Sequence, residues 1–313
     1  MRYFHSDISR GFNLSGEEKI EVLRKELREA DVVVIGAGAG LSNAAGLTYS
    51  GERFEKYFSD FEEKYGFRDM YSGGFYPYQS LEQFWGFWCR SIWINRYSPI
   101  PSDLYTKLFS LVKDKDYFVL TTNVDHCFQR TEFDKTRLFY TQGDYGLFQS
   151  SNPRGASLYK TYDNKDLIRK MVESEGYMVL ENGELTVKDG VELKTEIPLD
   201  LVPICPDDNE LMTTNLRIDN FFVEEKGWNL ASERYSRFIK GHQKQHVLYL
   251  ELGVGMNTPV IIKYRFWRYT DEQKKAFYVC INKGEAYCPK EIEKRSLCID
   301  GDISEIVDSL KKI

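Results

Sequence analysis

Residues 31–46 have the sequence DVVVIGAGAGLSNAAG, from which the class of fold follows. The β-branched run Val32–Ile35 is typical of a strand buried on both faces. Gly36, Gly38 and Gly40 follow it, and glycines here let the backbone turn tightly and approach a pyrophosphate. The spacing is G-x-G-x-G rather than G-x-G-x-x-G, so an ordinary strand-to-helix turn stays open as an alternative.

The rest of the chain repeats this alternation of strand and helix. Ser15 and Glu18 form a capping box that predicts a helix over residues 16–30. Further helices are expected over residues 229–244 and 302–312. Buried strands separated by helices predict an α/β fold with a Rossmann-like, doubly wound, mostly parallel sheet. The other predicted strands are residues 116–122, 137–141, 246–253, 276–282 and 296–300.

The pattern changes between residues 146 and 227, where the segments are short and alternating. Asn182-Gly183, within YMVLENGELTVK, predicts a type I′ hairpin. We therefore expect a small inserted domain at 146–227 and a nucleotide-binding domain made of 1–145 and 228–313. The aromatic run FWGFWCRSIWINRY (84–97) has helical spacing, which favours core or cleft lining over a platform for stacking nucleic-acid bases.

Composition limits the function. The 313 residues are 42% hydrophobic and 29% charged, which are globular values, and the net charge of -6 gives no basic footprint for nucleic acid. Neither a secretory signal nor an apolar run long enough to span a membrane is present. We expect a soluble, cytoplasmic protein that binds neither nucleic acid nor membranes. Six scattered cysteines without a C-x-x-C pair argue against disulfides, and the spacing gives a zinc site no support.

Several strand ends carry residues suited to a ligand. Asn123 and Asp125, in TTNVDH, follow the strand at 116–122 and would point into the crevice at the carboxyl edge of the sheet. The strands at 246–253 and 276–282 also end in small or polar residues. Nucleotide binding is therefore the preferred interpretation of the glycine loop.

At this point the order of motifs resembles the sirtuin family of NAD-dependent enzymes. Residues 38–47, which begin Gly-Ala-Gly-Leu-Ser and end Gly-Leu, are similar to the family's NAD-binding loop. Residues 121–125 resemble the segment that contacts the nicotinamide and its ribose. Three later motifs match in the same order, namely residues 253–255 and 281–282, which resemble the adenosine-binding loops, and the closing segment 301–310.

The resemblance implies NAD as co-substrate. Which aromatic residue covers the nicotinamide stays open, because residues 48–51 replace the family's Pro-[DT]-Phe-Arg. The implied NAD-binding residues are Gly38, Ala39, Gly40, Ser42, Leu47, Tyr49, Thr122, Asn123, Asp125, Gln142, Gly253, Val254, Gly255, Asn282, Lys283 and Ile303.

Departures from the family pattern change the implied reaction. Sirtuin deacylases have His-Gly after the strand at 137–141, where this chain has Gln142-Gly143, and an amide cannot serve as a general base. The inserted domain lacks the two C-x-x-C pairs that bind zinc and keeps only Cys205-Pro206, so no metal is expected. LRIDNFFVEE (216–225) resembles the acyl-lysine-binding strand but lacks its glycine.

With these substitutions the sequence resembles the class M, macrodomain-linked branch of sirtuins. This resemblance implies that the protein is a mono-ADP-ribosyltransferase that acts on proteins. The implied catalytic residues are Asn123, Gln142, Arg217 and Asp125. The implied acceptor is a lipoylated carrier protein related to the glycine-cleavage H protein, and a macrodomain hydrolase acting on the product is a further implied partner. Arg217 would steer an acidic acceptor or stabilise the pyrophosphate, unless it forms an ordinary surface ion pair.

Other activities stay open at this level. They are an NAD-dependent lysine deacylase of sirtuin type, an NAD glycohydrolase and a non-catalytic NAD sensor. His126, beside Asp125, is a candidate substitute base, but the family geometry would turn it away from the crevice.

Overall fold

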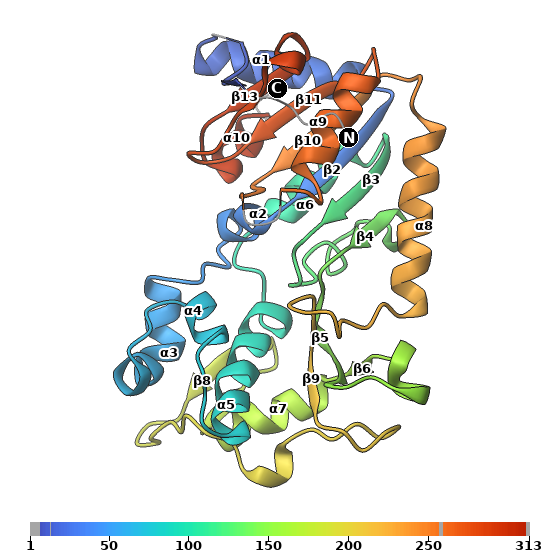
Figure 1. The fold of residues 1–313 in the computed structure, drawn as a ribbon. Helices are drawn as coiled ribbons and strands as arrows, with labels where there is room; N and C mark the ends of the chain where they lie inside the picture. The colour runs from blue at the N-terminus through green and yellow to red at the C-terminus, as the bar shows by residue number, and fades with distance from the viewer. Residues whose placement is uncertain (1–6, 13, 257–258, 311–313) are drawn as a thin grey trace.

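The computed structural model describes residues 7–12, 14–256 and 259–310, and its upper part is built on a parallel sheet (Figure 1). The sheet has six strands, and every neighbouring pair is parallel. The strand order reverses between β2 and β10, because the chain builds outward from β2 to β4 on one side and from β10 to β13 on the other. The doubly wound prediction is therefore confirmed. In spatial order the strands are β13 (Ser296–Ile299), β11 (Phe277–Ile281), β10 (Val247–Leu252), β2 (Val32–Ala37), β3 (Asp116–Thr121) and β4 (Leu138–Tyr140).

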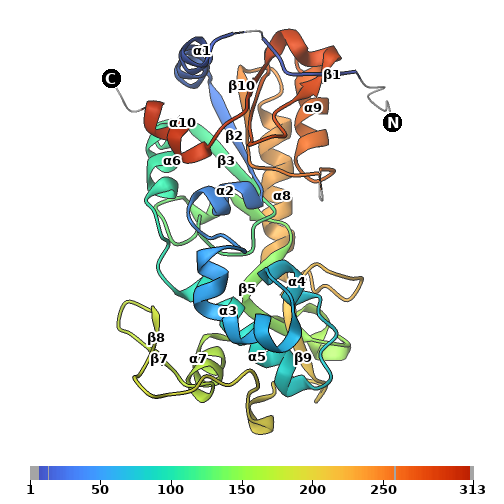
Figure 2. The same ribbon diagram turned by 90° about the vertical axis from the view of Figure 1, so that its left-hand side faces the viewer.

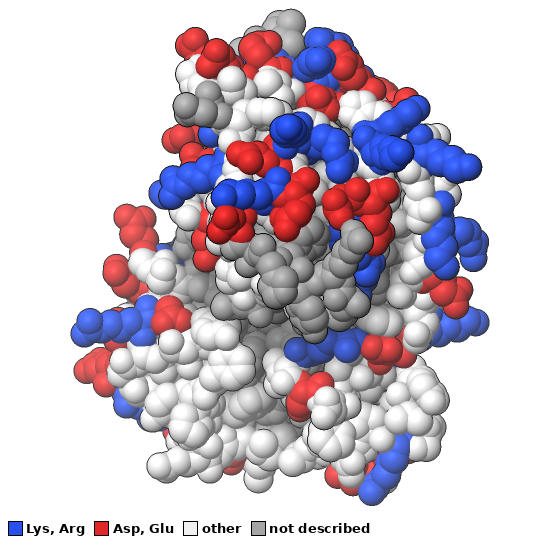
Figure 3. Space-filling view, turned by 45° about the horizontal axis from the view of Figure 1, so that its top comes forward, with Lys and Arg blue, Asp and Glu red and all other residues white. Residues whose placement is uncertain are grey.

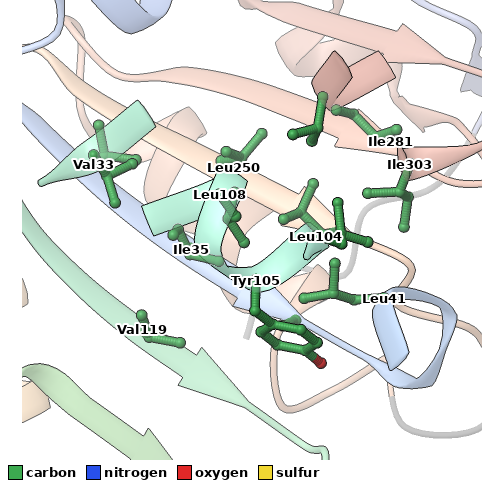
Figure 4. Packing of buried hydrophobic residues seen from close by; sticks show 14 of the residues in the cluster. Val33, Ile35, Leu41, Leu104, Tyr105, Leu108, Val119, Leu250, Ile281 and Ile303 are labelled. Atoms are coloured by element: carbon green, nitrogen blue, oxygen red, sulfur yellow. The ribbon is translucent and has the colours of Figure 1, made fainter. Parts of the chain in front are cut away.

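Helices cover both faces of this sheet. α1 (Gly16–Glu29), α6 (Leu104–Val112) and α10 (Ile303–Leu310) pack on one face, where Leu104 and Leu108 meet Ile35 and Leu250 (Figure 4). α8 (Lys226–Gly241) and α9 (Lys263–Glu272) pack on the other face. The predicted capping box at Ser15 and Glu18 starts α1. The short α2 (Ala39–Ala44) follows β2 at the edge that faces the second part of the molecule (Figure 2).

The second part is smaller and mixed. An antiparallel sheet joins β6 (Tyr162–Asp163), β5 (Gly143–Ser150) and β9 (Met212–Leu216). It packs with α7 (Lys165–Ser174), a hairpin, and four helical segments from earlier in the chain. The hairpin is β7 (Tyr177–Val179) with β8 (Leu185–Val187), and the earlier segments are α3 (Glu52–Tyr65), α4 (Met70–Gly74), α5 (Leu81–Ile92) and a π-helix at Trp93–Tyr97.

The aromatic run at 84–97 lies in the core of this second part, as its spacing predicts. Trp85 and Ile92 are fully buried, and Trp85 meets Phe148 of β5. The helical segments at 52–97 therefore share one apolar core with residues 145–212. The proposed domain boundaries stay a prediction, and this shared core argues for adding 52–97 to the small domain.

Two expectations about glycines are wrong. The hairpin forms, but its turn is not type I′, because Asn182 is not among the described non-glycine residues with positive φ. Instead Gly183, at φ 90°, donates to Leu180 O (2.9 Å). Gly36 does not lie in the turn but inside β2, where a Cβ would come within 2.4 Å of Phe266. Gly36 thus lets α9 approach the sheet.

The remaining elements are peripheral. β1 (Ile8–Ser9) pairs with β12 (Cys288–Pro289), and short 3₁₀ helices lie at Lys135–Arg137, Gly155–Tyr159, Leu199–Leu201 and Lys290–Arg295. All six cysteines are buried and free. None of the helices in the described part of the chain has the length and apolar character of a membrane span. Charges of both signs are mixed over the upper part of the face in Figure 3.

A buried arginine, and no group of metal ligands among the described residues, connects the segments of the small part. Over residues 7–12, 14–256 and 259–310, no three His, Cys, Asp or Glu side chains form a group that could hold a metal ion. Instead the buried Arg90 of α5 donates from Nε to Glu175 (3.0 Å), from Nη1 to Asp60 (2.7 Å) and from Nη2 to Lys194 O (2.7 Å). These residues belong to four segments, so one guanidinium links them. That no zinc is bound stays a prediction.

This linkage predicts a pH-dependent stability. Burial raises the pKa of Glu175 from 4.5 to about 7, although Arg90 opposes the shift. Between these values the unfolded chain binds fewer protons than the folded one, so stability should fall as pH rises from about 5 to about 7, by about 3 kcal/mol at most. Urea unfolding across this range should show the slope in the wild type and its loss in Glu175→Gln. An unchanged slope in Glu175→Gln would assign the effect to other groups.

Candidate active site

Two glycine loops meet at the carboxyl edge of the parallel sheet. Gly38 N donates to Leu252 O (3.0 Å), and Gly40 N donates to Gly253 O (2.9 Å). Gly253 has φ +61°, and a Cβ there would lie 2.5 Å from the Gly40 backbone. The loops can touch only because both lack side chains at this point. Ala39 and Gly40, at the start of α2, line a cleft beside this contact.

A cleft of about 380 Å³ lies at this edge and gathers many of the predicted site residues. Its walls come from the glycine loop, the segment after β3, and the π-helix of the small part. Gly38 lies beside it without lining it. The lining residues are Ala39, Gly40, Ser42, Asn43, Leu47, Tyr49, Asn95, Thr122, Asn123, Val124 and Asp125.

Asn123 and Asp125 are held by a hydrogen-bond network at the floor of the cleft. Asn123 Nδ2 donates to Gly38 O (3.0 Å) and to Ser42 Oγ (2.9 Å). Ser42 Oγ in turn donates to Asp125, whose other oxygen accepts from Cys127 N (2.9 Å). Asn123 is 8% exposed and Asp125 is 6% exposed. Asn123 Oδ1 has no hydrogen-bond partner among the described residues, so it can accept from a ligand.

The small part supplies one wall of the cleft. Tyr49 OH lies 2.8 Å from Tyr145 OH, and burial raises the pKa of both phenols. Asn95 was not predicted; its Oδ1 accepts from Arg53 (3.0 Å), and its Nδ2 donates to Ser91 O (2.9 Å). The signal that could have identified Asn95 is its polar side chain within the mainly aromatic and apolar run FWGFWCRSIWINRY. π-helical segments are frequent at functional sites.

Gln142 and Arg217 lie outside the lining of this cleft. Gln142 is half-buried at the end of β4, and its Nε2 donates to Thr141 Oγ1 (3.3 Å). Its backbone oxygen accepts from Arg217 N (3.0 Å). The Arg217 side chain lines a second hollow of about 480 Å³, where it pairs with Glu224 and lies over the Phe222 ring (4.4 Å to the centroid).

Gln142 therefore contacts a residue of the second hollow through its backbone, but it lines neither hollow. The structure joins Asn123 to Asp125 through Ser42, whereas Arg217 is joined to Gln142 by a backbone hydrogen bond. Trp228 Nε1 donates to Thr141 O (3.3 Å) and adds a second contact on the Arg217 side. The four predicted catalytic residues thus form two pairs, and they do not line one common pocket.

The residues predicted for the adenosine half lie along the neighbouring strand ends. Asn282 Nδ2 donates to Val254 O (3.1 Å) and so supports the second glycine loop. Gly255 and Lys283 are exposed. Ile303 is 4% exposed and packs in the core near Ile281 (Figure 4). None of these residues lines the cleft, and their role in binding stays a prediction.

Known proteins resemble this chain in sequence over most of its length. No family model matches the chain. It is 38% identical over 291 residues to a "Protein ADP-ribosyltransferase" of Staphylococcus aureus, covering 93% of this chain and 86% of the relative. It is 27% identical to a "Probable bifunctional ADP-ribose hydrolase/ADP-ribosyltransferase" of Fusarium oxysporum f. sp. cubense, over 93% of this chain and 47% of that longer protein.

Solved structures identify the fold. Sir2Tm bound to a propionylated peptide superposes with a TM-score of 0.54 at 18% identity, over 93% of this chain and 97% of that one. Sir2 with a p53 peptide and NAD⁺ gives a TM-score of 0.51 at 19% identity, over 93% and 96%. The sheet and its smaller companion therefore have the Sir2 arrangement, as the order of motifs predicts.

Proposed function

Because the chain belongs to the family of the Staphylococcus aureus protein ADP-ribosyltransferase and has the sirtuin fold, we propose that it is an NAD-dependent enzyme that transfers ADP-ribose to protein. The bond between nicotinamide and C1′ of the ribose breaks, nicotinamide leaves, and a side chain of the acceptor bonds to C1′. The runner-up functions are lysine deacylation, NAD hydrolysis and NAD sensing without catalysis.

The observation that carries this proposal is the chemistry of Gln142 beside the cleft. Deacylation by a sirtuin-type route needs a base that takes a proton from the ribose. Gln142 carries an amide, which has no comparable basicity. Direct attack of an acceptor on C1′ requires no general base at position 142. Gln142 can hold a ribose hydroxyl by hydrogen bonding without deprotonating it.

The other residues have complementary roles in this proposal. Asn123 is fixed by Gly38 and Ser42, so its free Oδ1 can orient the nicotinamide amide or the ribose. Asp125 is the acidic residue among those that line the cleft, and its carboxylate stabilises the positive charge that develops on the ribose. Arg217, in the second hollow, guides an acidic acceptor side chain by charge-assisted hydrogen bonds. NAD would thus enter from one hollow and the acceptor from the other.

For the acceptor we propose a lipoylated carrier protein related to the glycine-cleavage H protein, with a macrodomain hydrolase acting on the product in the cytoplasm. Incubation with biotinylated NAD and lipoylated or unlipoylated carrier tests this directly. Label on the carrier supports transfer, whereas free ADP-ribose indicates hydrolysis. Unchanged NAD with measurable binding indicates a sensor. Equal labelling of an unrelated acidic protein would argue against the carrier.

Gln142→His is expected to create measurable deacylation of an acyl-lysine peptide. The imidazole restores a base near neutral pKa at this position, and general-base catalysis typically contributes about 10²–10⁴-fold. Release of the acyl group, followed by mass spectrometry, measures the gain. Gln142→Asn is the matched control, because it keeps an amide and should gain nothing. If both variants behave like the wild type, position 142 does not decide between the two reactions.

A further inference from the structure

A buried carboxylate behind the cleft joins three segments of the site. Asp144, near the start of β5, has a side chain that is 5% exposed. One of its oxygens contacts His126 Nδ1, and the other accepts from Arg96 Nε (2.7 Å) and Gly146 N (2.7 Å). Burial alone would raise the pKa of Asp144, but the hydrogen bonds and charges of His126 and Arg96 lower it. Asp144 is therefore a charged residue to which His126, Arg96 and the backbone of Gly146 are bound.

Each member of this network is a close chain neighbour of a site residue. His126 directly follows Asp125, and Arg96 directly follows Asn95. Asp144 itself lies two residues after Gln142. The network therefore connects the segment after β3, the π-helix and the strand that begins beside Gln142, and each of these carries a residue of the candidate site.

Further contacts tie the same segments together. Tyr145 N donates to Val124 O (2.9 Å), which joins β5 to the segment after β3. Arg130 donates to Arg96 O (3.1 Å) and Ser98 O (2.7 Å), which joins that segment to the end of the π-helix. The Asp144 network is thus the side-chain part of a larger junction.

The local backbone is adapted to this network. His126 has φ +65°, a conformation that costs a non-glycine residue about 1 kcal/mol or more. Gly146 leaves room for Arg96, because a Cβ there would lie 2.8 Å from Arg96 Nε. The positive φ of His126 and the missing side chain of Gly146 therefore allow His126 and Arg96 to reach the same carboxylate.

We propose that Asp144, clamped by His126 and Arg96, is a positioning residue for NAD cleavage. It holds Asp125, Asn95 and Gln142 at the separation that the ribose requires, and it touches no substrate itself. This inference rests on the proposed function, because it concerns the same reaction centre. Small displacements of positioned groups cost about 10²-fold in rate.

Asp144→Asn tests the proposal, because it keeps the size of the side chain and removes the negative charge that accepts from Arg96 and contacts His126. We expect kcat for nicotinamide release to fall about 10–100-fold, while KM for NAD changes less than about threefold. His126→Asn is a second variant that keeps the test open if Asp144→Asn fails to fold, since asparagine accepts positive φ. It should show the same split with a smaller fall in kcat.

Asp166→Asn is the matched control, because this exposed carboxylate lies on α7 of the same small part. It should leave both constants unchanged. The proposal is overturned if Asp144→Asn keeps kcat within threefold, or if its loss is carried by KM. If the wild type releases nicotinamide but labels no protein, the proposed transfer is wrong. The ratio of kcat between Asp144→Asn and the wild type then still tests the role of Asp144. A wild type that releases no nicotinamide overturns both.

Discussion

Asn123→Ala is expected to lower kcat for NAD cleavage by about 10²–10³-fold, the usual cost of removing one preorganised hydrogen-bonding group from a reaction centre. Asn123 is fixed through both hydrogens of its Nδ2, by Gly38 O and Ser42 Oγ, so its Oδ1 is held in one direction. Alanine removes that acceptor and also frees Ser42, which orients Asp125. The loss should therefore appear in kcat more than in KM, because the glycine loop remains.

Nicotinamide release at saturating NAD measures the effect, with an independent measurement of NAD binding by calorimetry. Asn152→Ala is the matched control, since Asn152 is an exposed asparagine in the small part and far from the glycine loop in sequence. It should retain full activity. If Asn123→Ala keeps kcat within about threefold of the wild type, the site assignment is wrong.

The parallel sheet was predictable because each of its strands is buried on both faces. Such strands are continuous apolar runs, and these are visible in the sequence without knowledge of their neighbours. All six predicted strands are present, with ends that differ by one or two residues. Gly253 and Asn123 were also identifiable, because strand ends at one edge of a parallel sheet meet in space.

The second part was less predictable because distant segments build it. Residues 52–97 and 145–212 share a core only after the chain has folded, so neither segment shows in sequence that it needs the other. Asn95 was missed for the same reason, since its place in the cleft depends on Arg53 and on a π-helical turn. Arg217 illustrates a related limit. A motif places it in the site, but only the structure shows that it lines a separate hollow.

The tie centred on Arg90 is the clearest case of a feature that sequence patterns hide. An arginine at a helical position is ordinarily exposed, but Arg90 is fully buried and lies over the Phe61 ring (4.7 Å to the centroid). Its partners come from residues 57–60, 175 and 194, which are far apart in the chain. Arg90 thereby holds together three segments that no sequence motif identifies as neighbours.

Arg90→Leu is expected to destabilise the fold by about 3–5 kcal/mol, because removing one partner of a buried ion pair leaves the other uncompensated. Glu175 and the carbonyl of Lys194 would lose their partner inside the core. Urea unfolding measures the loss. Arg169→Leu is the matched control, since Arg169 makes an exposed pair with Glu173 on α7 and should change stability by less than about 0.5 kcal/mol.

The pH dependence of this loss separates the ion pair from simple packing. Because burial raises the pKa of Glu175 to about 7, that carboxyl is mostly neutral at pH 5 and mostly charged at pH 8. Removing Arg90 should therefore cost less at pH 5 than at pH 8, whereas a lost packing contact would cost the same at both. Glu175→Gln in the Arg90→Leu background should restore part of the stability at pH 8. Equal losses at both pH values would show that Arg90 acts through its contacts with aromatic rings and carbonyls alone.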